Sequence, residues 1–252
     1  MSDETDLPPR VVLLWGLNDA PRRGPKASLT VGDITRAAVE VADAEGLGAV
    51  SMARVAAQLG NATMALYRHV KSKDELLQLM SDAAMESPPD LPEGGDWREG
   101  LTLWVTEVLT VLRRHPWCAQ IPISGPPVGP HNLAWFDRAL DALSGTGLSE
   151  EEKVGVVMGL LTYVQGEMRL SLELAAAYAE NPEAFGRQYG RALTSVVDPR
   201  RLPALSRVVE AGVFDAESLY AEEEYDDFAL GLTLYLDGLA AFIARRSGLP
   251  DS

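Results

Sequence analysis

Cationic and hydrogen-bonding side chains gather in one short stretch of an otherwise acidic chain. Between positions 51 and 73 there is no Asp or Glu, although the whole chain has a formal net charge of −15. The same stretch contains Arg54, Tyr67, Arg68, His69, Lys71 and Lys73. Guanidinium, ammonium and phenol groups are donors that bind phosphate oxygens, so this stretch is predicted to contact a nucleic-acid backbone.

The charge is divided unevenly along the chain. Residues 21–73 hold 8 Lys and Arg against 4 Asp and Glu, so the remaining residues carry a formal charge of −19. A small basic segment attached to a large acidic one indicates that one end of the protein meets phosphate. Ordinary scatter of surface charge is the alternative. Upstream, Arg22, Arg23 and Lys26 could enter a minor groove or belong to a solubilising tail.

Helix signals surround these residues. Apolar periodicity and glycine breaks predict four helices, over about 30–46, 51–59, 63–70 and 72–85. Thr30, Ser51 and Ser72 are expected to cap three of them, because their hydroxyls can accept hydrogen bonds from free backbone N–H groups. Gly60 separates the second helix from the third. Two short helices joined by a tight turn are typical of a helix-turn-helix, whose second helix lies in the DNA major groove.

The third predicted helix has an inward and an outward face. If Leu66 and Val70 pack inward, helical periodicity turns four other side chains outward: Thr63, Met64, Ala65 and Arg68. Methyl groups can contact thymine and a guanidinium can bind guanine or phosphate, so this face is predicted to read bases. Lys73 lies in the first turn of the fourth helix, where free N–H groups favour an anion. A helical hairpin with a solvated basic face is the alternative.

Residues 29–86 resemble the DNA-binding domain of the tetracycline-repressor (TetR) family. Five spaced residues match the family signature LYxHFxxKxxL: Leu66, Tyr67, His69, Lys73 and Leu76. The resemblance implies a ligand-responsive transcriptional regulator, most often a repressor, that binds a pseudo-palindromic operator as a homodimer and is released by a small-molecule effector. It also implies that Tyr67, His69 and Lys73 contact operator phosphates or fix the recognition helix. His69 could instead be a packed histidine at the helix end.

Three positions depart from the usual pattern of that family. Ala62 stands where a capping Ser is usual, so Asn61 or Thr63 is expected to cap the recognition helix instead. Asn61 itself replaces a small apolar residue. Ala65 replaces a frequent Thr or Ser, which removes a hydroxyl donor and leaves the base preference open.

Longer helices follow a Pro- and Gly-rich boundary at 87–96. They are expected over about 96–114, 131–144, 149–179, 182–196, 200–212 and 222–246. The predicted fold is therefore all-α: an N-terminal three-helix DNA-binding head with a helix-turn-helix, joined by a fourth helix to a larger helical ligand-binding and dimerisation body. The expected domains are a flexible basic arm (1–29), the DNA-binding domain (30–86) and the effector-binding and dimerisation domain (87–252).

Glycines recur at helical spacing in two of the long helices. Glycine inside a helix costs about 1 kcal/mol relative to alanine, so such a series indicates close approach of another backbone. The residues expected at a homodimer interface are Gly155, Gly159, Gly166, Phe228, Gly231, Tyr235 and Gly238. Packing of the same faces within one chain is the alternative.

Aromatic and methionine side chains of the body are candidates for lining a ligand cavity. The predicted effector-binding residues are Trp104, Trp135, Met158, Tyr163 and Met168. Ordinary core packing is the alternative for each of them.

Other classes of function lack support in the sequence. The single Cys118 excludes an intramolecular disulfide, and neither it nor the three histidines have metal-ligand spacing, so no metal and no cofactor are expected. There is no phosphate loop and no nucleophile motif, so the chain is not expected to be an enzyme. A helical interaction module, or a helical-bundle enzyme whose head only resembles a DNA binder, is the alternative. No stretch is long enough to span a bilayer and no signal peptide is recognisable, so a cytoplasmic protein without a membrane partner is expected.

Overall fold

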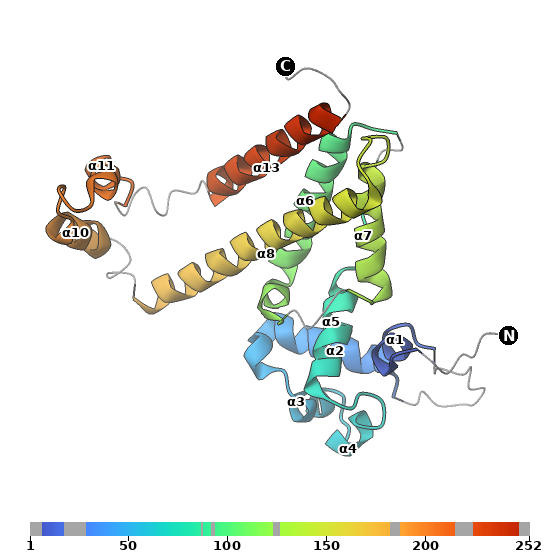
Figure 1. Cartoon of the computed structure of the whole chain (residues 1–252). Coiled ribbons are helices and arrows are strands. Elements are labelled where there is room, and N and C mark those ends of the chain that lie inside the picture. The colour runs from blue at the N-terminus through green and yellow to red at the C-terminus, as the bar shows by residue number, and fades with distance from the viewer. Residues whose placement is uncertain are drawn as a thin grey trace. The chain divides into compact units, whose positions relative to one another are not determined.

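Helices are the only regular secondary structure in the part of the chain that the structure describes. The computed structural model describes residues 7–17, 29–86, 88–91, 94–122, 127–181, 187–214 and 224–246. Within these ranges the chain contains no strand (Figure 1), which agrees with the predicted all-α class. The chain divides into two compact units, residues 1–165 and 166–252, and one long helix crosses their boundary.

A short helix lies inside the segment that is expected to be a flexible arm. This helix, α1 (Pro9–Leu14), has proline at its first position, where no backbone N–H is needed. Leu13 and Leu14 pack against the apolar core of the helices that follow. Six residues are too few for the sequence to reveal a helical period, so α1 could not be predicted. The basic residues at 22, 23 and 26 lie outside the described ranges.

Four α-helices and one 3-10 turn build the head. They are α2 (Val31–Glu45), η1 (Leu47–Ala49), α3 (Met52–Gln58), α4 (Thr63–Leu66) and α5 (Lys73–Ala84). The predicted caps are confirmed. Thr30 forms a full capping box with Asp33, and the hydroxyls of Ser51 and Ser72 each accept a hydrogen bond of 3.1 Å from the backbone N–H three residues later.

The recognition helix α4 is shorter than predicted. The sequence predicts helix over 63–70, but the α-helix ends at Leu66. The backbone N–H groups of His69 and Val70 both donate to the Leu66 carbonyl at 2.9 Å, so the chain tightens into a turn there. Leu66 and Val70, the two residues predicted to pack inward, are nevertheless both fully buried, although Val70 lies beyond the end of the helix.

The start of α4 also differs from the prediction. Its N-cap is Ala62, and no side chain bonds the free N–H groups of the helix. The Asn61 side-chain amide instead donates to the Leu59 carbonyl at 2.9 Å, which stabilises the preceding turn. The expectation that Asn61 or Thr63 would cap α4 is therefore wrong.

One apolar core holds the head together and extends beyond it. Its fully buried members include Ile34, Val41, Val50, Val55, Leu66, Val70, Leu76 and Met80. Trp117, which is 2% exposed, belongs to the same core although it lies more than 30 residues downstream of α5. The head therefore packs against the segment that contains Trp117, which follows the helix Trp97–Arg114.

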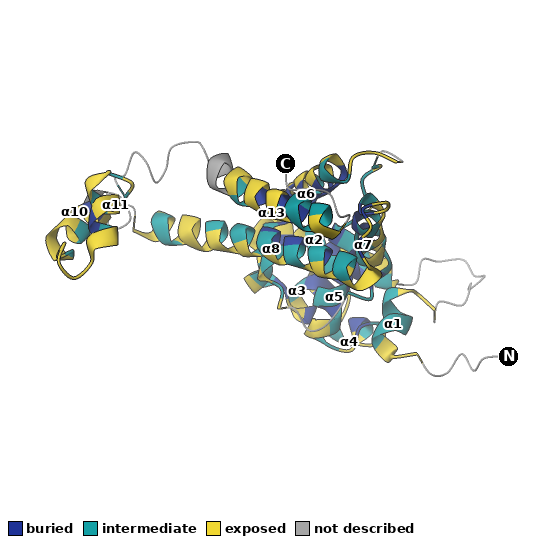
Figure 2. Cartoon of the chain, turned by 45° about the horizontal axis from the view of Figure 1, so that its top comes forward, coloured by how far each residue is buried: buried dark blue, intermediate teal, exposed yellow. Residues whose placement is uncertain are grey.

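The rest of the first unit consists of α6 (Trp97–Arg114), the 3-10 helix η2 (Pro116–Gln120), α7 (Pro130–Ala142) and the start of α8 (Glu150–Glu180). Pro116 ends α6, because proline cannot continue the hydrogen-bond ladder. Figure 2 and the burial of each residue show that buried residues are common in α2, α3, α5 and α6, whereas α10 (Arg187–Val196) and α11 (Pro203–Glu210) of the second unit are mostly exposed.

The last helix, α13 (Glu224–Arg246), is unusually apolar. The segment Phe228–Arg246 is long and apolar enough to cross a membrane by length and composition alone. This corrects the expectation that no stretch is long enough, which rested on the absence of an uninterrupted apolar run: here Asp237 lies within the apolar segment. Leu230 and Leu234 of this helix are 57% and 64% exposed.

Candidate functional site

A glycine turn sets the angle between α3 and α4. Gly60 has φ of +65°, a left-handed conformation that residues with a Cβ rarely adopt. A Cβ at this position would meet nothing within 4 Å, so the requirement for glycine comes from the backbone alone. The turn allows α4 to leave α3 sharply while both helices bury apolar residues in one core.

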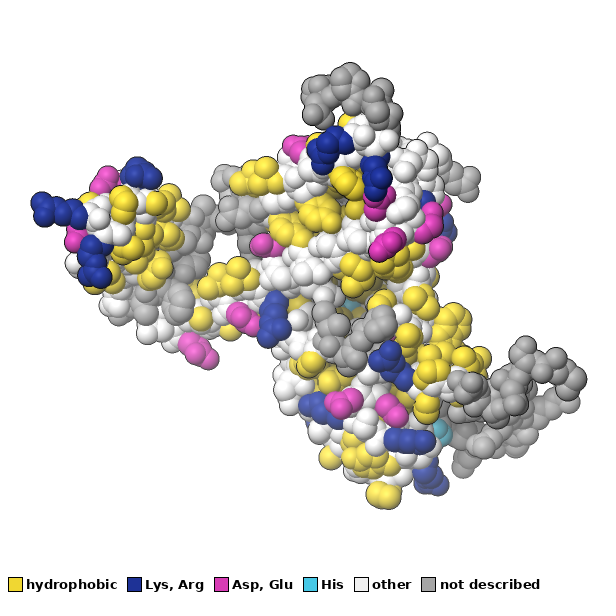
Figure 3. All heavy atoms as spheres, viewed as in Figure 1, with side chains coloured by type: hydrophobic (Ala, Val, Ile, Leu, Met, Phe, Trp, Pro, Cys, Tyr) yellow, Lys and Arg dark blue, Asp and Glu magenta, His cyan; other side chains and the backbone are white. Residues whose placement is uncertain are grey.

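The outer face of α4 is well exposed. Met64 is 72% exposed and Tyr67 is 41% exposed, and the Arg68 side chain is also exposed. Thr63 and Ala65 are half-buried beside them. Figure 3 shows Lys and Arg side chains around the lower end of the molecule, where Figure 1 places α3 and α4. The predicted base-reading residues therefore share an accessible surface.

Lys71 and Lys73 flank the start of α5. Both side chains are exposed, and His69 next to them is half-buried. Glu75 in the first turn is held by the backbone, since its carboxylate accepts a 2.7 Å hydrogen bond from the Lys71 N–H. Both lysines therefore lie in sequence at the N-terminal end of a 12-residue helix, where the helix dipole favours an anion.

Arg54 has a different environment from the other predicted DNA-binding residues. Its Nε donates to Glu45 Oε1 at 3.2 Å and its Nη1 to Gln58 Oε1 at 3.0 Å. The hydrogen bond from Arg54 lowers the pKa of Glu45 below its usual value. Arg54 thus joins α3 to α2, and a phosphate would have to compete with Glu45 for its guanidinium.

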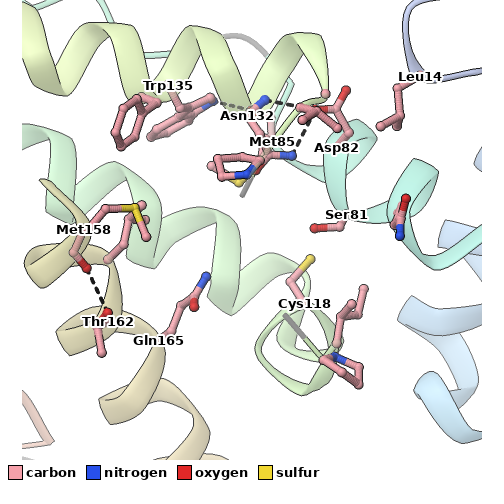
Figure 4. A pocket seen from close by; sticks show the side chains of 18 of the residues that line it. Leu14, Ser81, Asp82, Met85, Cys118, Asn132, Trp135, Met158, Thr162 and Gln165 are labelled. Atoms are coloured by element: carbon pink, nitrogen blue, oxygen red, sulfur yellow. Dashed lines mark hydrogen bonds between the residues drawn. The ribbon is translucent and has the colours of Figure 1, made fainter. Parts of the chain in front are cut away.

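A cavity of about 220 Å³ opens among α1, α5, α6, η2, α7 and the first half of α8 (Figure 4). Its lining is made of Arg10, Leu14, Gln78, Ser81, Asp82, Met85, Trp104, Cys118, Ile121, Pro122, Pro127, Val128, Gly129, Asn132, Trp135, Phe136, Met158, Leu161, Thr162 and Gln165. Three predicted effector-binding residues are among these: Trp104, Trp135 and Met158. Tyr163 and Met168 are not. Most of the lining is apolar or aromatic, as in sites for small organic molecules.

Two tryptophans fix the wall of the cavity to the end of α5. Trp104 Nε1 donates to the Trp135 carbonyl at 2.9 Å, and Trp135 Nε1 donates to the Met85 carbonyl at 2.7 Å. The two rings meet edge to face with centroids 6.4 Å apart. Met85 is the C-cap of α5, so an indole satisfies a helix-end carbonyl that has no partner within the helix.

Asp82 ties α5 to the N-terminus of α7. It is 5% exposed, and its Oδ1 accepts hydrogen bonds of 2.9 Å from both the backbone N and the side-chain Nδ2 of Asn132. His131 Nδ1 lies 3.1 Å from its Oδ2. A Cβ on Gly129 would come within 2.0 Å of the carboxylate, so only glycine leaves room for this contact. Asp82 acts as a cap supplied by another helix, and local sequence gives no signal for it.

The N-terminal helix contributes to the same cavity. Trp15, the C-cap of α1, donates from Nε1 to the Val128 carbonyl at 2.8 Å. This bond fixes α1 beside the loop before α7. Arg10 and Leu14 then line the cavity, four residues apart and therefore on one side of α1.

A second cluster of hydrogen bonds joins the body to the head, between the exposed Asp43 and two buried side chains. Asp43 on α2 accepts hydrogen bonds at its Oδ1 from His115 Nδ1 at 2.7 Å and from Trp117 Nε1 at 2.6 Å. Burial, together with the charge of Asp43, raises the pKa of the nearby Cys118 thiol to about 12. Such a thiol is un-ionised and unreactive at neutral pH. Among the described residues, no group of three or more His, Cys, Asp or Glu is placed to hold a metal ion.

The residues predicted at a dimer interface lie on α8 and α13. Gly155, Gly166 and Gly238 are exposed, and a Cβ on any of them would meet nothing within 4 Å. Close packing within the chain therefore does not account for these glycines. Gly159, Phe228, Gly231 and Tyr235 are half-buried.

Two parts of the chain match the descriptions of one protein family. Residues 34–80 match the family described as "Bacterial regulatory proteins, tetR family", and residues 88–243 match "Tetracyclin repressor-like, C-terminal domain". The HTH-type transcriptional repressor DrrR1 of Streptomyces coeruleorubidus is 38% identical over 255 residues, which cover 98% of this chain and 90% of that protein.

Solved structures show the same likeness. The apo structure of ActR from Streptomyces coelicolor has a TM-score of 0.71 and 27% sequence identity, covering 87% of this chain and 99% of ActR. ActR in complex with actinorhodin has a TM-score of 0.69 and 26% identity, covering 86% of this chain and 97% of that one. With both family descriptions matched and a near full-length relative, the chain belongs to the tetR family of bacterial transcriptional regulators.

Proposed function

We propose that this chain is a transcriptional repressor that binds a pseudo-palindromic operator as a homodimer and leaves it when a small molecule occupies the cavity. DrrR1, which is 38% identical, is named as a repressor, and ActR, which is 26% identical, was solved with actinorhodin bound. The outer residues of α4 read base edges in the major groove, and Tyr67, His69, Lys71 and Lys73 bind phosphates on either side.

One observation supports the proposal: α5 carries residues of both proposed sites. Lys73, its first residue, lies at the DNA-binding surface, while Ser81, Asp82 and Met85 at its other end line the cavity. A helix rises about 1.5 Å per residue, so the two ends are roughly 15 Å apart on one continuous helix. A ligand that shifts the last turn of α5 must shift its first turn as well.

The ligand acts by favouring a head spacing that does not fit the operator. Two heads must lie about 34–36 Å apart to occupy successive major grooves on one side of DNA. The ligand changes this spacing only if it binds the other spacing more tightly. Operator DNA must then weaken ligand binding by the same factor by which the ligand weakens DNA binding.

The partner of the apolar helix α13 is proposed to be a second copy of the chain. Exposed Leu230 and Leu234, with the glycine at 238, give a surface that can pack closely on another helix. We assign this surface to the homodimer rather than to lipid, in a protein that meets its DNA in the cytoplasm.

The experiment that tests the function is selection of bound fragments from a genomic library at low salt, followed by salt titration of the selected sequence. A repressor of this kind enriches a pseudo-palindrome, and its affinity for that sequence falls steeply as salt rises. Fragments recovered without any shared sequence would refute the proposal. A thermal-shift screen of small molecules on the same protein then identifies effectors, since a bound ligand raises the melting temperature.

A further inference from the structure

The charged groups in the cavity wall already interact with other parts of the protein. Among the described residues that line the cavity, only Arg10 and Asp82 are charged. Asp82 Oδ1 accepts two hydrogen bonds of 2.9 Å from Asn132, and its Oδ2 lies 3.1 Å from His131 Nδ1. Arg10 also interacts with another group of the protein. An ionised ligand would have to break one of these interactions or lose its water without a counter-charge, and both are costly.

Several uncharged polar groups of the wall are also in use. The indole N–H groups of Trp104 and Trp135 donate to backbone carbonyls at 2.9 and 2.7 Å. The Thr162 hydroxyl donates to the Met158 carbonyl at 2.8 Å. A ligand could bind these donors only at the expense of a hydrogen bond within the protein.

Ser81 and Gln165 differ from these groups. Neither side chain forms a hydrogen bond with the part of the chain that the structure describes. In that part no fully buried side-chain N or O atom lacks a partner, so the unpaired atoms of these two residues are accessible. Figure 4 shows Ser81 on α5 and Gln165 on α8 pointing into the cavity, which both of them line. A hydroxyl and an amide can each donate and accept a hydrogen bond.

We propose that the cavity binds an uncharged, largely apolar molecule whose carbonyl or hydroxyl group is recognised by the Gln165 amide and the Ser81 hydroxyl. Apolar side chains of the wall surround the rest of the molecule, among them Leu14, Phe136 and Leu161. Gln165 is the last residue of the first unit, so the whole site lies within one unit. A ligand held by both groups connects α5, which begins at the DNA-binding surface, to α8. The inference rests on the proposed function only in taking the cavity as the effector site.

Two fluorescent probes with one ring system test the preference for an uncharged ligand. N-phenylnaphthylamine is neutral, and anilinonaphthalene sulfonate adds an anionic group to it. In the full-length protein the neutral probe should bind at least about tenfold more tightly, because the sulfonate loses water without gaining a free counter-charge. Equal or tighter binding of the sulfonate, at a site from which the neutral probe displaces it, would overturn the proposal. This comparison needs no variant and is independent of any effect of mutation on folding.

A carbonyl probe tests the two hydrogen-bonding residues. Prodan, an uncharged naphthalene ketone, emits at longer wavelength when its carbonyl accepts a hydrogen bond. It should displace N-phenylnaphthylamine from the parent protein and show this red-shifted emission when bound. Gln165→Leu and Ser81→Ala should each weaken Prodan binding about fivefold, the size of one neutral hydrogen bond. Each change should also move the emission of bound Prodan to shorter wavelength.

The matched control is Thr162→Val, on the same helix as Gln165. Thr162 also lines the cavity, but its hydroxyl is already bonded, so Prodan affinity should stay within about twofold and the emission should not move. Circular dichroism checks that each variant is folded, and Gln165→Met replaces Gln165→Leu if the leucine variant loses helix content.

Three results of the variant experiment would overturn the proposal. They are equal effects of the Thr162 and Gln165 changes, an affinity and emission of bound Prodan that depend on neither Gln165 nor Ser81, and neutral probes that do not bind or do not compete. Operator binding measured without probe reports separately on the proposed function.

Discussion

The Nδ1 atom of His115 lies 2.7 Å from Oδ1 of Asp43, and this contact joins the end of α6 to the first helix of the head. The same oxygen accepts the indole N–H of Trp117 at 2.6 Å. His115 and Trp117 are only 8% and 2% exposed, whereas the side chain of Asp43 that accepts from both is exposed. A single carboxylate oxygen on α2 therefore satisfies two buried groups of the body.

Asp43→Ala should lower the free energy of unfolding by about 2–4 kcal/mol, because two buried donors lose their acceptor. Asp43→Asn keeps an oxygen in place and should cost less, about 1 kcal/mol. Urea denaturation measures both. Glu40→Ala, an exposed position on the same helix, is the control and should change stability by less than about 0.5 kcal/mol. Equal stability of Asp43→Ala and the parent protein would contradict this account.

Cys118 should resist alkylation in the folded protein. With the pKa raised to about 12, the thiolate is scarce at pH 8, and iodoacetamide should react about tenfold or more slowly than with the urea-unfolded chain. The unfolded thiol loses its proton near pH 9 while the folded one keeps it until about 12, so this group makes stability fall as pH rises through that window. Cys118→Ser should flatten the pH dependence there. A native rate equal to the unfolded rate would rule out the raised pKa of the Cys118 thiol.

Gly129→Ala should disrupt the clamp between α5 and α7. The new Cβ would lie 2.0 Å from Asp82 Oδ1, so the carboxylate must move and α7 loses its cap. We expect a loss of about 2–4 kcal/mol by urea denaturation, comparable to overpacking plus a lost cap.

A double-mutant cycle distinguishes this clash from a general effect of alanine. Asp82→Ala should cost much less in the Gly129→Ala background than in the parent, because the clamp is already broken. Gly48→Ala, where a Cβ meets nothing within 4 Å, is the matched control and should be neutral or slightly stabilising. Additive losses for positions 82 and 129 would mean that the two do not act through one contact.

Lys73→Ala should weaken binding to all DNA sequences alike and make the salt dependence shallower by about one unit, as removal of a phosphate contact does. Arg68→Ala should instead change which operator is preferred. Fluorescence anisotropy on operator variants measures both effects. Lys153→Ala is the control, since Lys153 lies on α8 and pairs with Glu150 at 2.7 Å. If both head variants lost the same affinity on every sequence, the division of roles would be wrong.

Gly155→Leu combined with Gly238→Leu should convert the dimer to monomers and abolish operator binding. A Cβ at either position meets nothing within 4 Å in its own chain, so the protomer should stay folded. Sedimentation velocity gives the oligomeric state and circular dichroism the helix content. The corresponding alanine pair adds only two methyl groups and should remain dimeric. A tight dimer of the leucine variant would remove these glycines from the interface.

Local signals account for what the sequence predicted correctly. Thr30, Ser51 and Ser72 could be predicted as caps because a cap and its helix are neighbours in the chain. The burial of Leu66 and Val70 could be predicted from helical periodicity alone. Contacts between distant segments have no such signal. Asp82 bonds residues 49 and 50 positions away, and Asp43 bonds residues 72 and 74 positions away. Trp104, Trp135 and Met158 could be predicted as cavity residues from their side-chain types. Arg10 could not, because it lies on a helix that the sequence did not predict.

The four-residue length of α4 limits how much sequence one head can distinguish. Even with Arg68 included, the predicted base-reading residues span six positions, roughly 9 Å at helical rise, which is fewer than three base-pair steps of B-DNA at about 3.4 Å each. A genome offers about 10⁶ or more competing positions, far more than so few base pairs can separate. The base contacts of one head alone are therefore too few to select an operator from a genome. Selective binding requires the base contacts of two heads, whose selectivities multiply. In the proposed homodimer, any change that separates the protomers should therefore abolish operator selection even if each head keeps its own base contacts.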